Sequence, residues 1–374
     1  MVPSLNSIPA FDNKLQYASM EAEISAAVLD VLASGRYIGG PVIEGFEQQF
    51  AAYHRVSNCI ACNSGTDALY LALRALEIGA GDEVITTPFT FIATSEVISA
   101  VGAKPVFIDI NPGTYNLDLR QLAAAITPKT RAVIPVHLFG QPVDMDSLME
   151  LATAKNIFVI EDCAQSTGAT WGRKKVGSIG HVGCFSFYPT KNLGGCGDGG
   201  AITTNDPELA AMMRVIKNHG QSNQYYYEAV GVNSRLDAIQ AAILQIKLKY
   251  LDMWNQQRRA IASRYHSPLS QIPGIIIPQE LSKGKGVWNQ YTIRVLDGKR
   301  DWLRQKLQEL GVNTMVYYPM PLHLQPVYAN LNYEPGQLPV SEQISHEVLS
   351  LPMFPELSEE QQEQVIYALK DSLS

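Results

Sequence analysis

The amino-acid sequence predicts an α/β fold, with a large domain over residues 1–255 and a smaller α+β domain over residues 256–374. Three observations support this prediction. The chain has 374 residues, which is long for a single hydrophobic core. Strand-like apolar runs alternate with helical patterns through the first two thirds, as in βαβ units. A long helical stretch then leads to a second group of strand and helix patterns.

The candidate strands of the large domain are short runs rich in apolar residues. They are Glu83 to Thr87, Lys104 to Asp109, Ala132 to Val136, Ile157 to Glu161, Val182 to Ser186 and Ala201 to Thr204. Helical patterns between them cover Ala68 to Leu76, Ser95 to Val101, Leu117 to Ile126 and Met145 to Lys155. This alternation predicts a mostly parallel sheet covered by helices on both faces. Ligands of such sheets bind beyond the carboxyl ends of the strands, so those residues are the first candidates for a site.

The second domain is expected to follow a long helix. Residues Arg235 to Leu269 carry apolar side chains at helical spacing and form the bridge to this domain. Beyond the bridge, Val287 to Val295 is strand-like, and residues 301–310 and 358–372 have helical patterns. The sequence therefore predicts a smaller domain of mixed strands and helices.

Charge and composition argue against several classes of protein. Acidic residues outnumber basic ones, 36 against 29, and the net charge is −7, so nucleic acid is not an expected partner. The N-terminus lacks the pattern of a signal peptide, and no run of 18 apolar residues is present, which predicts a cytoplasmic protein without membrane association. The five cysteines and seven histidines do not form a disulfide framework or a metal-binding pattern. Cys59 and Cys62 would point to opposite faces of one strand.

The first candidate segment for a functional site runs from Asn63 to Leu69. A strand ends there, a Ser-Gly-Thr turn follows, and a helix rich in alanine and leucine begins. Free N–H groups and the helix dipole make such a start an anion-binding site. Simple N-capping by Ser64 or Thr66 explains this segment equally well when it is considered alone.

The second segment runs from Asn156 to Gln165. A buried apolar strand delivers two adjacent carboxylates, Glu161 and Asp162, at its carboxyl end, where they point to opposite sides. One of them can face a ligand, and a carboxylate against a protonated pyridine nitrogen keeps that ring cationic. A helix cap or a surface ion pair is the alternative for this segment by itself.

The third segment runs from Cys184 to Gly200 and contains Lys191 between an aromatic strand and a loop with five glycines in seven residues. A lysine near apolar and aromatic groups can lose its proton and attack a carbonyl. The glycines would allow close approach of the backbone to a ligand and positive φ values. Ser186 could donate a hydrogen bond to a phosphate. A solvated loop lysine is the alternative.

These three segments, with others along the chain, resemble the DegT/StrS-type sugar aminotransferases, which are fold-type I pyridoxal-phosphate enzymes. The further matches are Ser34 to Gly40, Gly81 to Ile85, Thr90 to Thr94, Gly102 to Phe107, Pro135 to Gln141, Gly231 to Leu236 and Tyr318 to His323. The resemblance covers nearly the whole chain. It implies an aspartate-aminotransferase-like fold whose large domain holds a mostly parallel, seven-stranded sheet flanked by helices.

The resemblance also implies a role for each matched residue. Lys191 would be the Schiff-base lysine and the proton shuttle, and Asp162 would face the pyridine nitrogen of pyridoxal 5'-phosphate. The other implied cofactor contacts are Gly65, Thr66 and Ser186 at the phosphate, Phe91 stacked on the ring, Gln165 at the phenolic oxygen, and Asn233 at the phosphate of the neighbouring subunit. Arg235, Tyr318 and His323 fall in motifs near the substrate. A homodimer with shared active sites is therefore implied.

The implied reaction is transamination of a keto sugar, with glutamate as the amino donor. Relatives that dehydrate sugars carry histidine at the position of Lys191, so the intact lysine favours transamination. Trp288 to Arg294 and Gly197 to Gly200 resemble members that aminate C3 of a 3-keto dTDP- or UDP-hexose, whereas members acting at C4 often carry histidine near Asn289. Gly194-Gly195-Cys196 departs from the bulkier run of many relatives.

Three other functions remain open on the sequence. The acceptor could be a 4-keto nucleotide sugar, or it could be a cyclitol or an aminohydroxybenzoate precursor. The protein could also be a regulatory protein without enzymatic activity on the same fold. Loss of Lys191 or Asp162 would have supported the regulatory alternative, and both residues are present.

Overall fold

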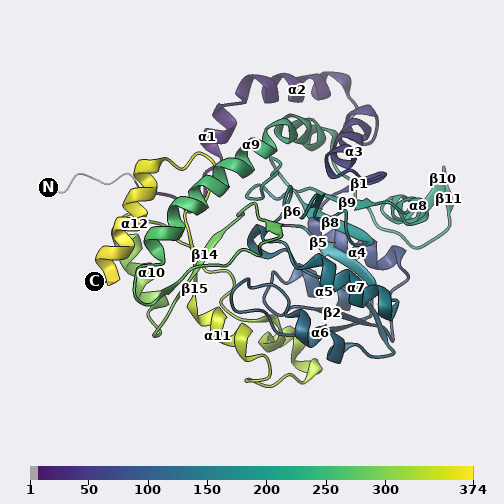
Figure 1. The fold of residues 1–374 in the computed structure, drawn as a ribbon. Coiled ribbons are helices and arrows are strands. Elements are labelled where there is room, and N and C mark those ends of the chain that lie inside the picture. Colours follow the sequence, from purple (N-terminus) through teal and green to yellow (C-terminus); the bar gives the residue numbers. More distant parts are fainter. Residues whose placement is uncertain (1–6, 374) are drawn as a thin grey trace.

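The computed structural model describes residues 7–373, and a seven-stranded sheet forms the centre of its larger part (Figure 1). In spatial order the strands are β1 (Asn58–Cys62), β9 (Gly200–Thr204), β8 (Val182–Ser186), β5 (Phe158–Asp162), β4 (Thr130–Val133), β2 (Glu83–Thr86) and β3 (Lys104–Phe107). Strand β9 runs antiparallel to β1 and β8, and the other neighbouring pairs are parallel. This arrangement confirms the mostly parallel, seven-stranded sheet.

Helices cover both faces of this sheet, because alternate strand residues point to opposite sides. One face packs on α4 (Gly65–Ala75), α5 (Ala93–Ala100) and α8 (Pro207–Ile216). The other packs on α3 (Pro41–His54), α6 (Leu119–Ala125), α7 (Met145–Lys155) and the first half of α9 (Ala238–Leu269). Cys62 belongs to the first layer and Cys59 to the second, which confirms that their side chains point apart.

A second hydrophobic core lies around the second half of α9. It contains Ile8 and side chains from the strands β12 (Ile275–Ile276), β14 (Tyr291–Val295) and β15 (Val348–Leu351) and the helices α10 (Arg300–Glu309) and α12 (Glu359–Leu373). Strand β14 pairs antiparallel with both β12 and β15. The predicted division between residues 255 and 256 falls inside the continuous helix α9, and it stays a prediction.

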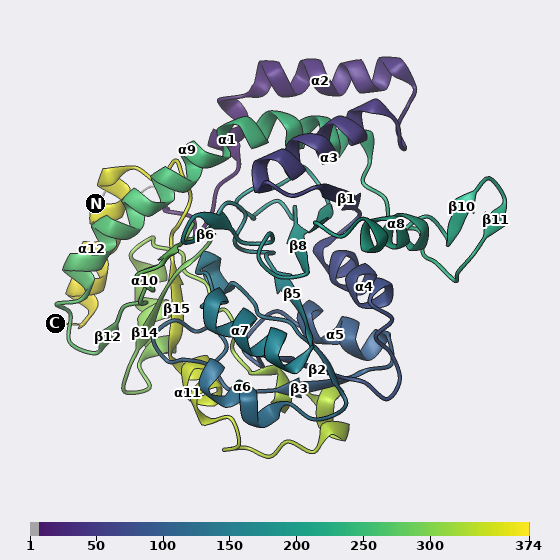
Figure 2. The same cartoon turned by 45° about the vertical axis from the view of Figure 1, so that its right-hand side comes forward.

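The remaining elements connect or flank these two parts. They are α1 (Lys14–Ala18), α2 (Glu21–Ser34), α11 (Pro339–Glu347), the short strands β6 (Thr170–Trp171), β7 (Lys174–Lys175), β10 (Gln221–Asn223), β11 (Tyr226–Tyr227) and β13 (Gly284–Lys285), and 3₁₀ turns at Leu138–Gly140, Leu322–Leu324 and Pro326–Leu331. Helix α2 lies along α9, and the β10–β11 hairpin projects from the body in both views (Figures 1 and 2). Among the helices of residues 7–373, none has the length and apolarity needed to cross a bilayer.

One predicted strand is shorter than expected. The pattern of Val287 to Val295 predicted a strand over its whole length, but β14 begins only at Tyr291. Trp288 has a φ of 47°, in the left-handed region that interrupts a strand. The backbone N–H groups on either side of it donate to carbonyls at residues 139–140 of the larger part instead. This segment therefore connects the small sheet to the carboxyl ends of the central strands.

Candidate active site

One cavity of about 490 Å³ lies beyond the carboxyl ends of β5 and β8, where the sheet order predicts a ligand site. It is lined by most of the residues that the sequence singled out. These are Gly65, Thr66, Phe91, Asp162, Gln165, Ser186, Lys191 and Tyr318. Segments more than 250 residues apart in the sequence therefore meet around a single space.

The start of α4 forms one wall of this cavity. Ser64 caps the helix by accepting the N–H of Asp67 at 3.1 Å, so the capping that the sequence allowed does occur. A Cβ atom on Gly65 would lie 2.7 Å from the Cβ atom of Ser186, so only glycine lets the helix begin this close to the end of β8. The first N–H groups of α4 and the hydroxyls of Thr66 and Ser186 therefore line the cavity together, an arrangement that suits a phosphate.

Asp162, the last residue of β5, is buried and presents its carboxylate to the cavity. Burial raises the pKa of Asp162 above its usual value, because it penalises the charged form. The N–H of Ala164 at 3.1 Å, the hydroxyl of Thr94 at 2.8 Å and the charge of Lys191 act in the opposite direction. A cationic ring nitrogen beside this carboxylate would offset the cost of its burial further.

Lys191 lies in the loop after β8, where the residue is half-buried and lines the cavity. Burial lowers the pKa of Lys191 to about 8, against a smaller opposing effect of Asp162. Side-chain amides hold the loop on both sides of the lysine: Asn289 donates to the carbonyl of Thr190 at 3.2 Å, and Asn192 donates to the carbonyl of Val287 at 3.0 Å. A fixed amine that is partly neutral near pH 8 can attack a carbonyl.

The glycines after Lys191 serve close packing. None of the five glycines at positions 194, 195, 197, 199 and 200 has a positive φ, so this part of the expectation is wrong. A Cβ atom on Gly194 would lie 2.4 Å from the carbonyl oxygen of Pro189, and one on Gly200 would lie 2.3 Å from that of Ser64. The loop needs glycine because neighbouring backbone segments approach too closely for a side chain.

Gln165, Tyr318 and Phe91 line the cavity, and Tyr318 contacts the other two. The amide oxygen of Gln165 accepts the N–H of Phe139 at 2.6 Å, and its nitrogen donates to the hydroxyl of Tyr318 at 3.1 Å. The rings of Phe91 and Tyr318 have centroids 6.4 Å apart. Phe91 is 57% exposed, so one face of its ring is free to contact a planar ligand.

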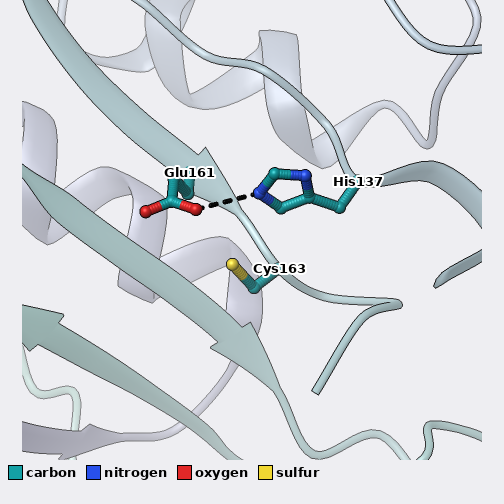
Figure 3. Close-up of side chains that lie close together, drawn as sticks. All are labelled: His137, Glu161 and Cys163. Carbon is teal, nitrogen blue, oxygen red and sulfur yellow. Dashed lines mark hydrogen bonds and ion pairs between the residues drawn. The ribbon is translucent and has the colours of Figure 1, made fainter. Parts of the chain in front are cut away.

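Glu161 points to the other side of β5 and is buried (Figure 3). Its Oε1 accepts the N–H groups of Ile179 at 2.8 Å and Gly180 at 2.6 Å. Its Oε2 accepts the N–H of Gly177 at 2.8 Å and lies 3.0 Å from Nε2 of His137. Because Nδ1 of His137 accepts the N–H of Val143, Nε2 carries the proton and donates it to Glu161.

Cys163 lies beside this pair, and the ligand atoms of His137, Glu161 and Cys163 are within 4.8 Å of one another (Figure 3). The spacing alone would suit a metal ion. However, the Glu161 carboxylate already accepts four hydrogen bonds, and burial raises the pKa of the Cys163 thiol. The group is thus explained by its role in fastening the loop at residues 177–180 to the strand that carries Asp162.

Replacing Glu161 by glutamine is expected to lower the free energy of unfolding by about 3 kcal/mol, because the new amide N–H₂ would face donors that need an acceptor. The urea midpoint measures this change. The matched control is Glu150→Gln on the exposed side of α7, with an expected change within about 0.5 kcal/mol. Equal midpoints for the two variants would contradict the role of Glu161.

Three residues that the sequence associated with the site do not line this cavity in the chain's own structure. Asn233 is exposed beside the β10–β11 hairpin, and Arg235 is half-buried nearby. His323 is buried, with its Nε2 3.1 Å from Glu342, so its position does not support a substrate contact. It lies on the 3₁₀ turn Leu322–Leu324.

Other residues line the cavity without having been assigned a role from the sequence. They are Ser64, Leu69, Thr90, Ala93, Thr94, Val136, Ala164, Tyr188, Thr190, Asp198, Gly199, Gln290 and Tyr317. Thr94 is the most informative, because its hydroxyl contacts Asp162 directly. Thr94 is the last residue of the matched segment Thr90 to Thr94, so this match could have identified it as a site residue. Gln290 and Tyr317 come from the small part of the chain, and only the tertiary structure brings them here.

Comparison with known proteins agrees with this geometry. The sequence profile of the DegT/DnrJ/EryC1/StrS aminotransferase family matches residues 18–370. The chain belongs to this family. Its members transfer amino groups, and the cavity with Lys191 and Asp162 is the place in this member where that chemistry fits. It is a pyridoxal-phosphate-dependent aminotransferase.

Several curated relatives of this aminotransferase cover almost its full length. A pleiotropic regulatory protein from Geobacillus stearothermophilus is 49% identical, over 96% of this chain and 97% of its own. A dTDP-3-amino-3,4,6-trideoxy-alpha-D-glucose transaminase from Streptomyces venezuelae is 46% identical, over 97% and 96%. A UDP-N-acetyl-3-dehydro-alpha-D-glucosamine 3-aminotransferase from Acidithiobacillus ferrooxidans is 42% identical, over 98% of each.

Solved structures of other family members superimpose closely on this aminotransferase. DesV from S. venezuelae, in complex with a ketimine intermediate, is 45% identical, with a TM-score of 0.96 over 98% of both chains. The pyridoxal-phosphate form of the sugar aminotransferase Spr1654 from Streptococcus pneumoniae is 28% identical, with a TM-score of 0.89 over 98% of both. The fold is therefore that of fold-type I aminotransferases, as the resemblance implied.

The depressed pKa of Lys191 predicts how the cofactor-free protein takes up pyridoxal phosphate. Below pH 8 the amine is mostly protonated and cannot attack an aldehyde, and above pH 8 it is mostly neutral. The rate of borohydride-fixable incorporation at Lys191 is therefore expected to rise with pH and level off above about pH 8. A rate that still rises towards pH 10.5, the usual value for lysine, would contradict the burial of this amine.

Proposed function

We propose that this aminotransferase places an amino group on C3 of a 3-keto hexose linked to dTDP or UDP, with glutamate as the amino donor. The observation that carries the proposal is that a buried, partly neutral amine and a buried carboxylate line one cavity with the start of a helix. These are Lys191, Asp162 and α4. The three groups match the three parts of pyridoxal phosphate: its aldehyde, its ring nitrogen and its phosphate.

The roles of the residues follow from their positions. Bound pyridoxal phosphate supplies an aldehyde that holds the amino group and a ring that accepts electrons from the substrate carbon. Asp162 keeps the proton on the ring nitrogen, and Thr94 holds the carboxylate by a hydrogen bond of 2.8 Å. Lys191 binds the cofactor and moves a proton at the substrate carbon through its Nζ. Ser186 and the first residues of α4 bind the phosphate.

The other cofactor contacts concern the ring. Phe91, which lines the cavity and is largely exposed, would stack on the ring, and Gln165 would contact its phenolic oxygen. The second N–H of the Gln165 amide is available for that bond, because the nitrogen gives one N–H to Tyr318. Tyr318 thus positions Gln165 and reaches the substrate side of the cavity.

The choice of C3 is supported by relatives with C3-amino products in their names. Besides the enzymes of S. venezuelae and A. ferrooxidans, they include a UDP-2-acetamido-2-deoxy-3-oxo-D-glucuronate aminotransferase, 45% identical over 350 residues. The relative named as a regulatory protein does not support a loss of catalysis here, since this chain keeps Lys191 and Asp162 in one cavity. A 4-keto sugar and a free cyclitol remain as alternative acceptors.

A panel of acceptors tests the proposed function. The purified protein, loaded with pyridoxal phosphate and given glutamate, is assayed with 3-keto and 4-keto dTDP- and UDP-hexoses and with a free cyclitol ketone. Amino-sugar formation is expected with a 3-keto nucleotide sugar. Activity with a 4-keto sugar alone would move the reaction to C4, and activity with the cyclitol alone would overturn the nucleotide-sugar assignment.

The protein is further proposed to act as a homodimer in which each subunit completes its partner's site. The β10–β11 hairpin projects from the body and exposes Tyr225 at 80%, next to the exposed Tyr226 and Tyr227, and Val230 just after the hairpin is 82% exposed. A cluster of exposed large apolar residues on a projecting element is typical of an interface. Asn233 follows this hairpin, so a partner's hairpin is the element that can bring an asparagine to the phosphate.

Hybrid dimers test this arrangement. Lys191→Ala and Asn233→Asp subunits are each expected to be inactive or weak as homodimers, the second because a carboxylate repels the phosphate. In a hybrid of the two, Lys191 of one chain and Asn233 of the other form one native site, so activity is expected to return. No recovery on mixing, with hybrids verified by two different tags, would show that Asn233 does not act across the interface.

A further inference from the structure

A second cavity, of about 460 Å³, adjoins the active-site cavity. The two share Thr190, Gln290 and Tyr317 as lining residues, so they meet directly beside the loop that carries Lys191. The rest of the second cavity is lined by Pro9, Ala10, Phe11, Asn289, Asn313, Met315, Ser350, Leu351 and Met353. Of the segments singled out in the sequence, Trp288 to Arg294 contributes Asn289 and Gln290, and the other walls come from the N-terminal segment, the small sheet and the lysine loop.

The lining of the second cavity selects an uncharged ligand group. None of its lining side chains is charged, and they combine apolar surfaces with amides and hydroxyls. A diphosphate or a carboxylate would lose its hydration there without gaining a cationic partner, which is costly. The cavity therefore suits neither the diphosphate of a nucleotide sugar nor the carboxylates of an amino donor.

Two buried oxygen atoms in this cavity lack partners. Asn289 is only 4% exposed, and its Nδ2 donates to the carbonyl of Thr190 at 3.2 Å, which fixes the orientation of the amide. Its Oδ1 is buried and has no hydrogen-bond partner among residues 7–373, and the same holds for Oε1 of the neighbouring Gln290. Buried acceptors normally have donors, so the cavity calls for a group that brings an N–H or O–H.

We propose that the second cavity is a subsite for an uncharged, hydrogen-bond-donating group carried on the ring of the acceptor sugar. A ring hydroxyl and the N–H of an acylamino group share this chemistry. The inference rests on the proposed function, because it assumes that the acceptor is a sugar. It adds a specificity role for Asn289 and Gln290, which lie between the substituent and the backbone next to Lys191.

Two exposed methionines provide a matched pair for the test. Met315 is 40% exposed and lines the second cavity, whereas Met253 on α9 is 49% exposed and lines neither cavity. Met315→Trp fills the subsite from its rim and is expected to raise KM for the acceptor by about tenfold or more. Met253→Trp is expected to leave KM within about twofold of the native value. Equal KM values for the two variants would overturn the proposal.

A second variant tests the hydrogen bond without blocking the cavity. Gln290→Leu removes the unpartnered Oε1 at similar side-chain volume, and an expected increase in KM of about threefold to tenfold corresponds to one neutral hydrogen bond. The conversion of the bound cofactor by glutamate alone, followed by absorbance, is measured in parallel. A variant that slows this half-reaction as much as acceptor turnover would show a general defect and contradict a subsite.

Two acceptors that differ only in carrying an acetamido or a hydroxyl group at C2 show which of the two donor groups, an acylamino N–H or a ring hydroxyl, occupies the subsite. A KM increase for Met315→Trp limited to the acetamido sugar identifies an acylamino group, and an equal increase for both identifies a ring hydroxyl. An unchanged KM for both overturns the subsite. Failure of the proposed function gives a different result from failure of the subsite, because the native protein would then aminate no nucleotide keto sugar at all.

Discussion

Replacing Lys191 by alanine is expected to reduce kcat for amino transfer by at least about 10³-fold, because the variant loses both the group that binds the cofactor aldehyde and the proton shuttle. The fold is expected to survive, since alanine removes an amine whose charge is penalised by burial. Single-turnover assays with bound cofactor measure the effect, and circular dichroism verifies the fold.

Lys175→Ala is the matched control for this variant. Burial also lowers the pKa of Lys175 to about 8, but its amine lies over the ring of Tyr53, outside the cavity. Turnover of Lys175→Ala is expected to stay within about threefold of the native rate. If Lys191→Ala turned over normally, or if both variants lost activity equally, the assignment of Lys191 would be wrong.

Replacing Asp162 by asparagine is expected to reduce kcat by about 10²-fold to 10³-fold. The amide has nearly the same size and can still accept the hydrogen bond of Thr94 or Ala164, but it has no charge to keep a proton on the ring nitrogen. The ring would then accept electrons less well. The rate of the glutamate half-reaction and the absorbance of the bound cofactor measure the change.

Thr94→Val gives a graded comparison. It keeps the carboxylate and removes the 2.8 Å hydrogen bond to it, together with the 3.1 Å bond between the hydroxyls of Thr94 and Thr90, so the expected loss is about tenfold or less. If Thr94→Val lost as much activity as Asp162→Asn, the rate would depend on how the hydrogen bond positions the Asp162 side chain and not on its charge. Unchanged rates in Asp162→Asn would contradict the role of the carboxylate.

Much of the fold could be predicted because local signals were strong. Val182 to Ser186 and Met145 to Lys155 have the predicted bounds; in the helix, Asp144 provides the cap by accepting the N–H groups of Asp146 and Ser147. The antiparallel direction of β9 could not be predicted, because a strand that is buried along its whole length shows no apolar-polar alternation in either direction. Trp288 interrupted a predicted strand through contacts with a distant loop.

The candidate site could be predicted where it depended on short segments. Lys191, Asp162 and Gly65 lie within ordered motifs at strand or helix ends, and the structure brings them to one cavity. Gln290 and Tyr317 could not be predicted, since their approach depends on how the small sheet packs on the lysine loop. A single chain likewise cannot show where Asn233 acts, because the proposed contact needs a second subunit.

Helix α9 spans 32 residues and contributes Leu244 and Leu251 to one core and Ile261 and Tyr265 to the other. Because the continuous helix α9 joins the two parts of the chain, they cannot rotate about a flexible linker. A sharp bend in the helix would break its backbone hydrogen bonds. Any clamping motion around a substrate must therefore be of small amplitude and must come from flexing of α9 or sliding at its packed ends. A protease would find no cleavable linker there, so limited digestion is not expected to liberate the small C-terminal region intact.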